Sequence, residues 1–428
     1  LLCLINNVYY IYIILINKPM KIKRCQICNS KKIKKIISLG ATGLCDTLLT
    51  FKQTITKEKS YPLNLIRCEN CQLLQLDYIV NNKELFHLDY PYKSSITKPL
   101  VKLLQGTPVY LRKKFKFSKN PLAIDIGSND GTLLKGFKKM KFRTLGIEPT
   151  NISKIANKNR VKTIQRFFNL KTAKFISKKY KKASVITGTN LFAHVDKLNS
   201  FMKAIKILLD PEKGIFVTES HYAIDIIEDL QYDSIYHEHL RFYLVKPLVY
   251  LMEKHGLKII DAIRIPNYGG SIRISATLNK NIKPNKNVEK LLNFEKNKSF
   301  YKKSKYNKFY NDVIKSKNSL RKILLNIKKK GENIVGIGCP GRSITLLSYC
   351  KINRNILDYI AEQSSSLKLN LYTPNTHIPV LDEENFFENQ PEYALILSWH
   401  YGKSIMKSLR KKGYKGKFII PLPFPKII

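Results

Sequence analysis

Residues 233–242 read D-S-I-Y-H-E-H-L-R-F, so two histidines, a glutamate and a tyrosine stand together. The whole chain has only eight histidines in 428 residues. Such a concentration indicates a metal site, an acid–base site or a hydrogen-bonded polar turn. Metal-binding histidines on a helix stand at i and i+4, as in H-E-x-x-H. His237 and His239 are too close for that pattern and share a face only in an extended chain.

Acid–base chemistry fits this stretch better than metal binding. Tyr236 and His239 stand at i and i+3, and they would share a face if the segment were helical. Imidazole has a reference pKa of about 6.5, so it can be neutral and basic at working pH. We expect an acid–base site here, with a structural turn as the alternative.

Four of the eight cysteines form two C-x-x-C pairs near the beginning of the sequence, Cys25 with Cys28 and Cys68 with Cys71. Two such pairs can close a tetrahedral four-thiolate site, which has no open position and is therefore structural. Two separate reduced dithiols are the alternative. The pattern predicts a domain at residues 20–80 that binds structural Zn²⁺.

Residues 1–19 are mostly apolar, but they are short for a membrane span of about 20 residues. No basic segment precedes them and no small-residue cleavage site follows them. We interpret residues 1–19 as a non-native extension ahead of Met20, with a membrane anchor as the alternative.

The formal net charge of +45 would suit a partner such as nucleic acid. The lysines are spread over the whole chain, however, and form no stripe, which favours a solvated basic surface. We expect a cytoplasmic monomer that acts on a small molecule, with neither nucleic acid nor membrane as partner. A nucleic-acid-binding protein built on the cysteine module and the basic surface is the competing class.

From about residue 100, short β-branched runs alternate with lysine-rich helical segments. This alternation predicts an α/β fold with a doubly wound parallel sheet at residues 81–280. Residues 281–330 have helical spacing and few turn residues, so we expect a helical connector. A second, smaller α/β unit is expected at residues 331–428.

The sharpest motif is A-I-D-I-G-S-N-D-G-T-L-L at residues 123–134, an apolar strand followed by a glycine turn and a helix start. Glycines let the backbone approach a ligand closely. A dinucleotide fold would carry G-x-G-x-x-G here. This chain has D-x-G-x-x-x-G, with Asp125 inside the strand, which resembles the first loop of class I methyltransferases. Glu148 then ends the second strand in G-I-E-P, where a carboxylate can accept both ribose hydroxyls of a nucleoside.

The chain as a whole resembles the sugar C-methyltransferases of the branched-deoxysugar type. In order, the matching stretches are the two C-x-x-C pairs, Y-P-L-N-L-I-R-C-E-N-C-Q-L-L-Q-L, D-Y-P-Y-K-S-S, D-I-G-S-N-D-G, G-I-E-P, N-L-F-A-H-V-D, Y-D-S-I-Y-H-E-H-L, Y-G-G-S-I-R, G-C-P-G-R-S-I-T-L-L and T-H-I-P-V. The resemblance implies a zinc-binding domain, a class I methyltransferase Rossmann-like domain and a C-terminal Rossmann-like domain. It also implies S-adenosylmethionine as the methyl donor.

The resemblance further implies that His239 is the general base, with Tyr236, Glu238 and His194 as the other catalytic residues. The expected cofactor-binding residues are Asp125, Gly127, Ser128, Asn129, Asp130, Gly131, Glu148, Phe167 and Asn190. The expected metal ligands are Cys25, Cys28, Cys68 and Cys71. Substrate contacts are expected at Tyr90, Tyr92, Tyr268, Arg273, Arg342 and Lys368.

Three positions, in two motifs, depart from the pattern of the resembling family. Many members have histidine before G-G-S, where this chain has Tyr268, and many have lysine and asparagine where it has Arg342 and Ile344. The C-terminal unit also contains V-G-I-G-C-P-G, followed by Glu362 about 20 residues on, which taken alone suggests a nicotinamide site. The resemblance instead implies that this unit holds the substrate.

The sequence therefore predicts an S-adenosylmethionine-dependent C-methyltransferase of a nucleotide-linked keto-deoxysugar. A base removes the proton beside the ketone, and the resulting enolate carbon takes the methyl group. The residues after the fourth strand lack the N-P-P-Y tetrad of many enzymes that methylate nucleic-acid bases, which argues against such a substrate. Methyl transfer to oxygen or nitrogen of a sugar or another small metabolite is the alternative.

Overall fold

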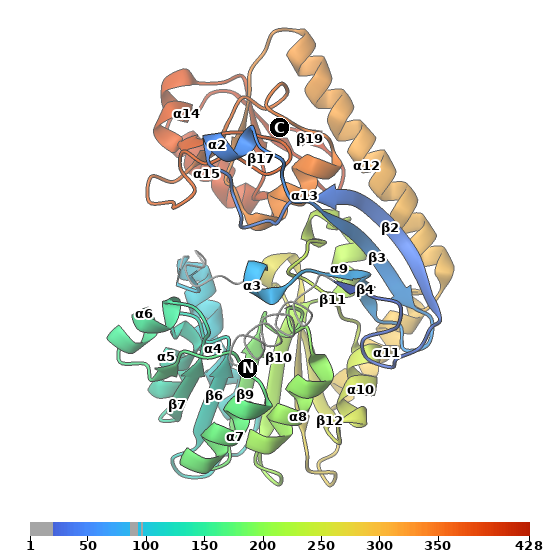
Figure 1. The fold of residues 1–428 in the computed structure, drawn as a ribbon, viewed down its shortest axis with the longest axis vertical. Coiled ribbons are helices and arrows are strands. Elements are labelled where there is room, and N and C mark those ends of the chain that lie inside the picture. The colour runs from blue at the N-terminus through green and yellow to red at the C-terminus, as the bar shows by residue number, and fades with distance from the viewer. Residues whose placement is uncertain (1–19, 86–92, 96) are drawn as a thin grey trace, which may run out of the picture.

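The computed structural model describes residues 20–85, 93–95 and 97–428. The predictions for residues 1–19, Tyr90 and Tyr92 fall outside these residues. Figure 1 shows three parts: a central α/β domain, a C-terminal α/β domain, and an N-terminal module (residues 20–85) that runs along both. Within the described residues, no helix is both long and apolar enough to cross a membrane.

The N-terminal module is a small antiparallel sheet. Its strands are β2 (Ile33–Thr42), β3 (Tyr61–Cys68) and β4 (Leu74–Leu76), and the order is β11-β4-β3-β2. The edge strand β11 (Arg241–Phe242) comes from the central domain. The short elements β1 (Met20–Lys21), β5 (Tyr78–Ile79), α2 (Phe51–Thr54) and α3 (Asn82–Leu85) complete the module.

The two C-x-x-C hairpins meet at one end of this sheet. The Sγ atoms of Cys25, Cys28, Cys68 and Cys71 all lie within 4.8 Å of one another, and three of these four residues are buried. A tetrahedral zinc ion with Zn–S bonds of about 2.3 Å needs four sulfurs at this spacing. The predicted metal ligands therefore come together in a set that fits a structural zinc ion.

The central domain is built on a seven-stranded sheet of order β12-β13-β10-β9-β6-β7-β8. All its pairs are parallel except those that β13 makes with β10 and β12. The strands are β6 (Leu122–Ile126), β7 (Arg143–Ile147), β8 (Thr163–Ile164), β9 (Val185–Thr189), β10 (Ile215–His221), β12 (Lys258–Ile265) and β13 (Ser271–Thr277). The helices are α4 (Lys98–Lys114), α5 (Thr132–Lys139), α6 (Ile152–Lys158), α7 (Leu170–Lys179), α8 (Leu198–Leu208), α9 (Ala223–Glu228) and α10 (Val245–Lys254).

The predicted doubly wound sheet is confirmed. Its inner strands are apolar on both faces because helices cover both sides, and every residue of β6 is buried. The strand order reverses between β6 and β9, and ligands bind at the carboxyl ends of strands at such a switch point.

Two helices, α11 (Lys286–Asn297) and α12 (Lys303–Lys329), lie between the two α/β domains in the sequence. The C-terminal domain has a six-stranded sheet of order β16-β15-β14-β17-β18-β19. Its strands are β14 (Ile334–Ile337), β15 (Ile360–Glu362), β16 (Val380–Asp382), β17 (Tyr393–Ile396), β18 (Lys417–Ile420) and β19 (Lys426–Ile427). Its helices are α13 (Gly341–Tyr349), α14 (Glu383–Asn389) and α15 (Gly402–Lys411).

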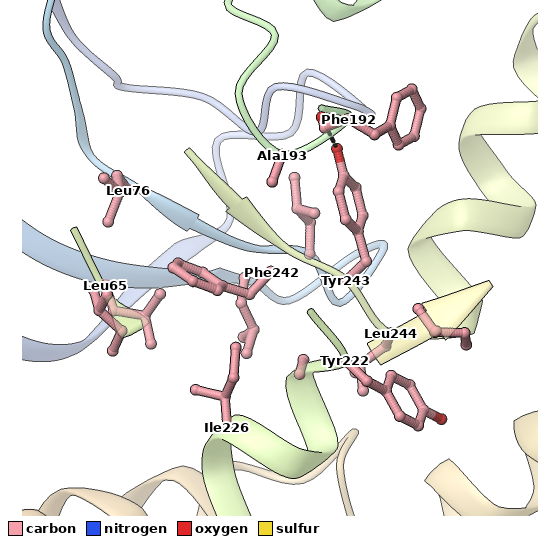
Figure 2. Packing of buried hydrophobic residues seen from close by; sticks show 14 of the residues in the cluster. Leu65, Leu76, Phe192, Ala193, Tyr222, Ile226, Phe242, Tyr243 and Leu244 are labelled. Atoms are coloured by element: carbon pink, nitrogen blue, oxygen red, sulfur yellow. Dashed lines mark hydrogen bonds between the residues drawn. The ribbon is translucent and has the colours of Figure 1, made fainter. Parts of the chain in front are cut away.

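Residues 233–242, which we call the catalytic turn after the role predicted for them, are held by all three parts of the molecule. β11 lies at the end of this segment and joins the sheet of the N-terminal module. Figure 2 shows the packing around β11, where Phe242 and Tyr243 lie among buried residues of the N-terminal module and of the central domain. The hydroxyl of Tyr243 donates to the carbonyl oxygen of Phe192 over 3.1 Å, and the two rings are stacked.

The start of the catalytic turn is tied to the C-terminal domain by a buried ion pair. Nε of Arg342 lies 3.0 Å from the Asp233 carboxylate, and the indole N–H of Trp399 donates to the same carboxylate over 2.8 Å. The Thr345 hydroxyl also donates to the Ile235 carbonyl oxygen over 3.1 Å. Burial raises the pKa of Asp233, and the Arg342 charge opposes that rise. Arg342 therefore favours the ionised form of this buried carboxylate.

The cysteine site leads to a test of metal dependence. We expect Cys68→Ser, or treatment with a strong chelator, to remove the zinc and unfold the N-terminal module. A structural zinc ion supplies folding free energy of several kcal/mol, so the thermal midpoint should fall on the order of 10 °C. Elemental analysis and calorimetry measure both effects. Cys350→Ser, at a buried cysteine outside the cluster, should keep the zinc. Retention of zinc by Cys68→Ser would refute the four-sulfur site.

The ion pair leads to a test of stability. Arg342→Met leaves the buried Asp233 carboxylate without its charged partner, so we expect it to cost about 3–5 kcal/mol of unfolding free energy. The double variant Asp233→Asn/Arg342→Met should recover part of this loss, because no buried charge remains. Lys412→Met serves as the control, since its pair with Glu383 is exposed and is worth about 0–1 kcal/mol. Denaturant unfolding measures the unfolding free energy of all three variants. Equal losses in Arg342→Met and Lys412→Met would contradict the prediction.

Candidate active site

The glycine loop that follows β6 has the backbone that the motif predicts. Gly127 and Gly131 have φ of 68° and 80°, and Asn129 has φ of 50°. A Cβ at Gly131 would stand 2.8 Å from the Val161 side chain. Glycine is thus required at residue 131 both for its positive φ and for the close approach. The loop ends at α5, whose first N–H groups favour an anionic or polar ligand group.

Glu148 and the glycine loop come together as the sequence predicts. The Glu148 carboxylate accepts the N–H of Asn129 over 3.0 Å, and it also accepts the N–H and the hydroxyl of Thr150. These donors fix the buried carboxylate at the end of β7, against the loop. Its predicted contact with ribose hydroxyls stays a prediction.

Asp125 lies inside β6 directly below the loop and is buried. The Thr187 hydroxyl donates to its carboxylate over 2.6 Å. Burial raises the pKa of Asp125 to about 7, with the charges of Glu148 and Glu219 adding to the effect and the Thr187 hydrogen bond opposing it. The carboxyl therefore changes its charge near neutral pH.

The D-Y-P-Y-K-S-S stretch ends on the same loop. The N–H of Ser94 donates to the Asn129 side chain over 2.8 Å, and the N–H of Ser95 donates to Asp130 over 3.0 Å. Asp130 also caps the start of α5 through Thr132. The predicted substrate residues Tyr90 and Tyr92 precede this anchor point in the sequence, although they lie outside the described residues.

The other three predicted cofactor residues lie at different depths. Asn190 follows β9 with a positive φ, and its N–H donates to the Glu219 carbonyl oxygen over 3.0 Å. Phe167 follows β8, and 47% of it is exposed. Ser128 is buried in the loop, where its Oγ has no hydrogen-bond partner in the described part of the chain. Cofactor contacts of all three stay predictions.

The side chains of His239 and Tyr236 are hydrogen-bonded to each other. The segment is a turn and not a helix, and the two side chains meet because the turn brings i and i+3 together. The Tyr236 hydroxyl lies 2.9 Å from Nε2 of His239, and Nδ1 of His239 lies 3.1 Å from the Ser234 carbonyl oxygen. Since a carbonyl only accepts, Nδ1 carries the proton and Nε2 is left as the basic nitrogen.

Two further histidine rings stand against His239. The ring centroids of His194 and His221 lie 5.0 Å and 4.7 Å from that of His239, both edge to face. Burial lowers the pKa of His194 to about 4 and of His221 to about 3, and it lowers the pKa of His239 well below its usual range. All three imidazoles are therefore neutral at working pH.

Sequence reasoning missed His221. The signal that could have found it is its position, because it is the last residue of β10 and so lies at the carboxyl ends of the sheet strands, where ligands bind. His237, in the same turn as His239, has a structural role. Its Nε2 lies 3.2 Å from the carbonyl oxygens of Tyr61 and Pro62, so it ties the turn to β3 of the N-terminal module.

Glu238 is buried in the same turn. Its charge adds to the burial that raises the pKa values of Tyr236 and of Cys45 in the N-terminal module. The raised pKa keeps the Tyr236 phenol protonated, so Tyr236 is a hydrogen-bond donor and not a base. Of the predicted catalytic residues of the turn, Tyr236 therefore contacts an imidazole with a fixed tautomer, and Glu238 acts on Tyr236 through its charge.

The loop after β9 joins the glycine loop to the histidines. A Cβ at Gly127 would stand 3.2 Å from the Leu191 side chain, so Leu191 packs against the glycine loop. Three residues on, His194 packs against His239. One short loop thus spans the distance from the predicted cofactor site to the predicted base.

The predicted substrate residues of the central and C-terminal domains mostly have protein partners. Arg273 is buried and donates to Glu219 over 2.6 Å and to Thr107 over 2.8 Å. Lys368 donates to Asp46 and to the Cys339 carbonyl oxygen. Arg342 bonds Asp233, as described above. Tyr268 has φ of 50°, and its ring centroid lies 5.9 Å from that of His221. Of these four, Tyr268 lies beside the histidine cluster, and the substrate contacts of all four stay predictions.

The glycine fingerprint of the C-terminal domain is used within the protein. The carboxylate of Glu362, which would bind a ribose in a nicotinamide site, accepts the N–H of Cys339 over 2.8 Å. A Cβ at Gly341 would stand 3.2 Å from the Asp46 carboxylate, so the loop packs against the N-terminal module. From the same helix start, Arg342 reaches the catalytic turn. The loop therefore serves to join the three parts.

Comparison with known proteins covers the three parts in the same order. Family profiles described as "Putative zinc binding domain", "Methyltransferase domain" and "C-methyltransferase C-terminal domain" match residues 25–86, 108–262 and 266–423. The chain is also 25% identical over 414 residues to the C-methyltransferase NovU of Streptomyces niveus, an alignment that covers 95% of this chain and 97% of that protein.

Solved structures resemble a smaller portion of the chain. A methyltransferase from Anabaena variabilis is 15% identical with a TM-score of 0.34, covering 41% of this chain and 85% of that one. A methyltransferase from Clostridium acetobutylicum is 15% identical with a TM-score of 0.31, covering 41% of this chain and 92% of that one.

The zinc-binding profile agrees with the four-cysteine site, and the methyltransferase profile agrees with the doubly wound sheet that carries the glycine loop. Together with the similarity to NovU, these matches show an S-adenosylmethionine-dependent C-methyltransferase that joins a zinc-binding domain, a class I methyltransferase domain and a C-terminal domain.

Proposed function

We propose that this enzyme methylates the carbon beside the ketone of a nucleotide-linked keto-deoxysugar, with His239 as the base. One observation carries the proposal: a neutral imidazole with a fixed tautomer is joined by a single loop to the glycine loop of the cofactor domain. A C–H bond beside a ketone is acidic enough for such a base when hydrogen-bond donors stabilise the enolate that forms. Methyl transfer to oxygen or nitrogen would not need carbon deprotonation.

The proton step follows from the geometry of His239. Nε2 takes the proton from the carbon beside the ketone, and the electron pair of the broken C–H bond moves onto the carbonyl oxygen as an enolate. The Ser234 carbonyl accepts the Nδ1–H and so stabilises the imidazolium that forms. Tyr236, now released from Nε2, is placed to donate its hydroxyl hydrogen to the substrate.

S-adenosylmethionine, when bound, supplies a methyl group on a positively charged sulfur that the enolate carbon can attack. The glycine loop, Glu148 and Asp125 would hold this molecule at the end of β6. The residues present fit it, because the loop backbone is open to close approach and the nearby carboxylates suit a cation and ribose hydroxyls. The protein's part is to orient the acceptor carbon and to keep the base neutral.

The sugar nucleotide is the finer part of the proposal and rests on the resemblance of the sequence motifs. Two structural features support it. The catalytic turn is enclosed by three parts of the chain, which suits a small molecule, and Arg342 of the C-terminal domain places a positive charge at its start. Such a charge would attract a phosphate-bearing substrate.

His239→Asn tests the base. Asparagine can keep a hydrogen bond to Ser234 but lacks the basic nitrogen at the Nε2 position. We expect exchange of the proton beside the ketone with deuterated solvent, and methyl transfer to carbon, both to fall about 10²–10⁴-fold, while S-adenosylmethionine binding stays unchanged.

Mass spectrometry of a panel of nucleotide-linked 4-keto-hexoses measures exchange and methylation separately. His255→Asn is the control, because His255 lies at the surface, bonded to Asn199. If methylation continued in His239→Asn while no exchange occurred in the wild type, an oxygen or nitrogen acceptor would replace the carbon acceptor.

Asp125 gives a prediction on pH. Its pKa in the folded protein is about 7, raised from its usual 3.8 by burial, so its contribution to stability is complete below about pH 4 and is lost as pH rises through 7. A cation bound beside it favours the ionised carboxylate. Binding of S-adenosylmethionine should therefore tighten between pH 6 and 8, by at most about tenfold per pH unit.

Calorimetric titration over this pH range measures the effect. The Asp125→Asn variant should bind with a flat pH dependence, because its amide does not titrate. A profile in Asp125→Asn that matches the wild type would show that another group controls cofactor binding.

A further inference from the structure

His221 has a buried ring nitrogen that no part of the described chain satisfies. It is the last residue of β10 and pairs with Ser271 of β13, at the carboxyl end of the switch region. Its Nε2 atom is buried without a hydrogen-bond partner in residues 20–85, 93–95 and 97–428. A buried polar atom left without a partner costs stability, so such an atom in a site indicates a ligand.

The position of Nε2 of His221 indicates that its ligand is the methyl acceptor and not the cofactor. The ring of His221 lies between two others, with centroids 4.7 Å from His239 and 5.9 Å from Tyr268. Tyr268 is fixed in a left-handed backbone conformation ahead of Gly269 and Gly270. A Cβ at Gly269 would collide with His400, so this wall of the site is closed by the C-terminal domain.

His221 differs from His239 in how its nitrogens are used. Both nitrogens of His239 already have partners, Ser234 and Tyr236. The direction of Nε2, the base nitrogen of His239, is thus fixed. An acceptor whose C–H bond approaches Nε2 must place its ketone beside the rings that surround His239. His221 is the neighbour whose Nε2 is open to a hydrogen bond.

The charge state of His221 suits a donor. Burial lowers its pKa to about 3, and the positive charge of Arg342 and the neighbouring His194 act in the same direction. The ring is therefore neutral, and Tyr236 and the ring of His239 beside it carry no charge either. A neutral imidazole can hold its proton on Nε2 and donate it without competing with His239 as a base.

We propose that Nε2–H of His221 donates a hydrogen bond to the ketone oxygen of the acceptor and holds that oxygen while it becomes the enolate. This inference rests on the proposed carbon methylation. No bond to His221 forms or breaks: the proton goes to His239, the electron pair goes to the ketone oxygen, and the negative charge is met by the imidazole N–H. A donor placed where negative charge develops lowers the barrier more than it tightens binding.

Two amide variants separate the two nitrogen positions of the ring. The side-chain amide that His221→Gln introduces reaches the position of Nε2, whereas the shorter amide of His221→Asn reaches the position of Nδ1. We expect His221→Asn and His221→Phe to slow both solvent exchange and methylation about 10²–10³-fold through kcat, with KM for the acceptor changed little. His221→Gln should recover at least tenfold of that loss. His255→Gln is the surface control.

The readouts distinguish the possible failures. If the His221 ring served only in packing, His221→Phe would slow the reaction least. Rates recovered in His221→Phe but not in His221→Gln would overturn the proposal. Equal loss in every variant together with a lowered thermal midpoint would also overturn it in favour of a structural role. If the wild type neither exchanges nor methylates any ketone of the panel while it binds S-adenosylmethionine, the proposed function itself fails, and the role of His221 fails with it.

Discussion

The buried polar groups of the catalytic turn impose the constraint on which the rest of the structure depends. Residues 233–242 place two carboxylates, two imidazoles, a guanidinium and several carbonyl groups where water cannot solvate them, and each such group needs a partner. The partners come from three parts of the chain. Arg342 and Trp399 of the C-terminal domain satisfy Asp233, whereas the β3 carbonyls of the N-terminal module satisfy His237.

This constraint explains why both the N-terminal module and the C-terminal domain pack against the catalytic turn. The four-cysteine site lies at the end of β3, and β4 of the same sheet pairs with β11 at the end of the turn. The Gln75 side chain also accepts the N–H of Gln26, inside the first cysteine hairpin, over 3.0 Å. A rigid metal site thus fixes the sheet that fixes the turn. Zinc here would act on catalysis through backbone position, since its closed coordination leaves no place for a substrate.

Much of this could be predicted from the sequence, because the signals are local. The cysteine spacing, the glycine loop with Asp125, and the alternation of strands and helices each lie within one short stretch of sequence, and the structure confirms the fold that they predict. The roles of His239 and Tyr236 came from the motif resemblance, and the turn brings these two residues together without the helix considered for it. Local spacing was enough because a tight turn also joins i to i+3.

What the sequence did not predict depends on contacts between distant segments. Arg342 is separated from Asp233 by 109 residues and a domain boundary, and the ion pair exists only because α13 docks on the catalytic turn. His221 is a single histidine at a strand end, and it becomes part of a site only when β10 lies next to β9 and the turn folds back over both. Neither has a spacing pattern of its own.

The low basicity of the buried histidines limits how the reaction can work. A base is most effective when its pKa is near the working pH, but burial moves the pKa of His239 far below it. A weak base can remove a carbon proton only if the product charge is stabilised, so the enolate oxygen must be met by good donors. Tyr236 and His221 are both neutral donors beside the base, and Arg342 adds a fixed positive charge nearby. The same dry surroundings that weaken the base strengthen these interactions, and they keep water away from the enolate until its carbon is methylated.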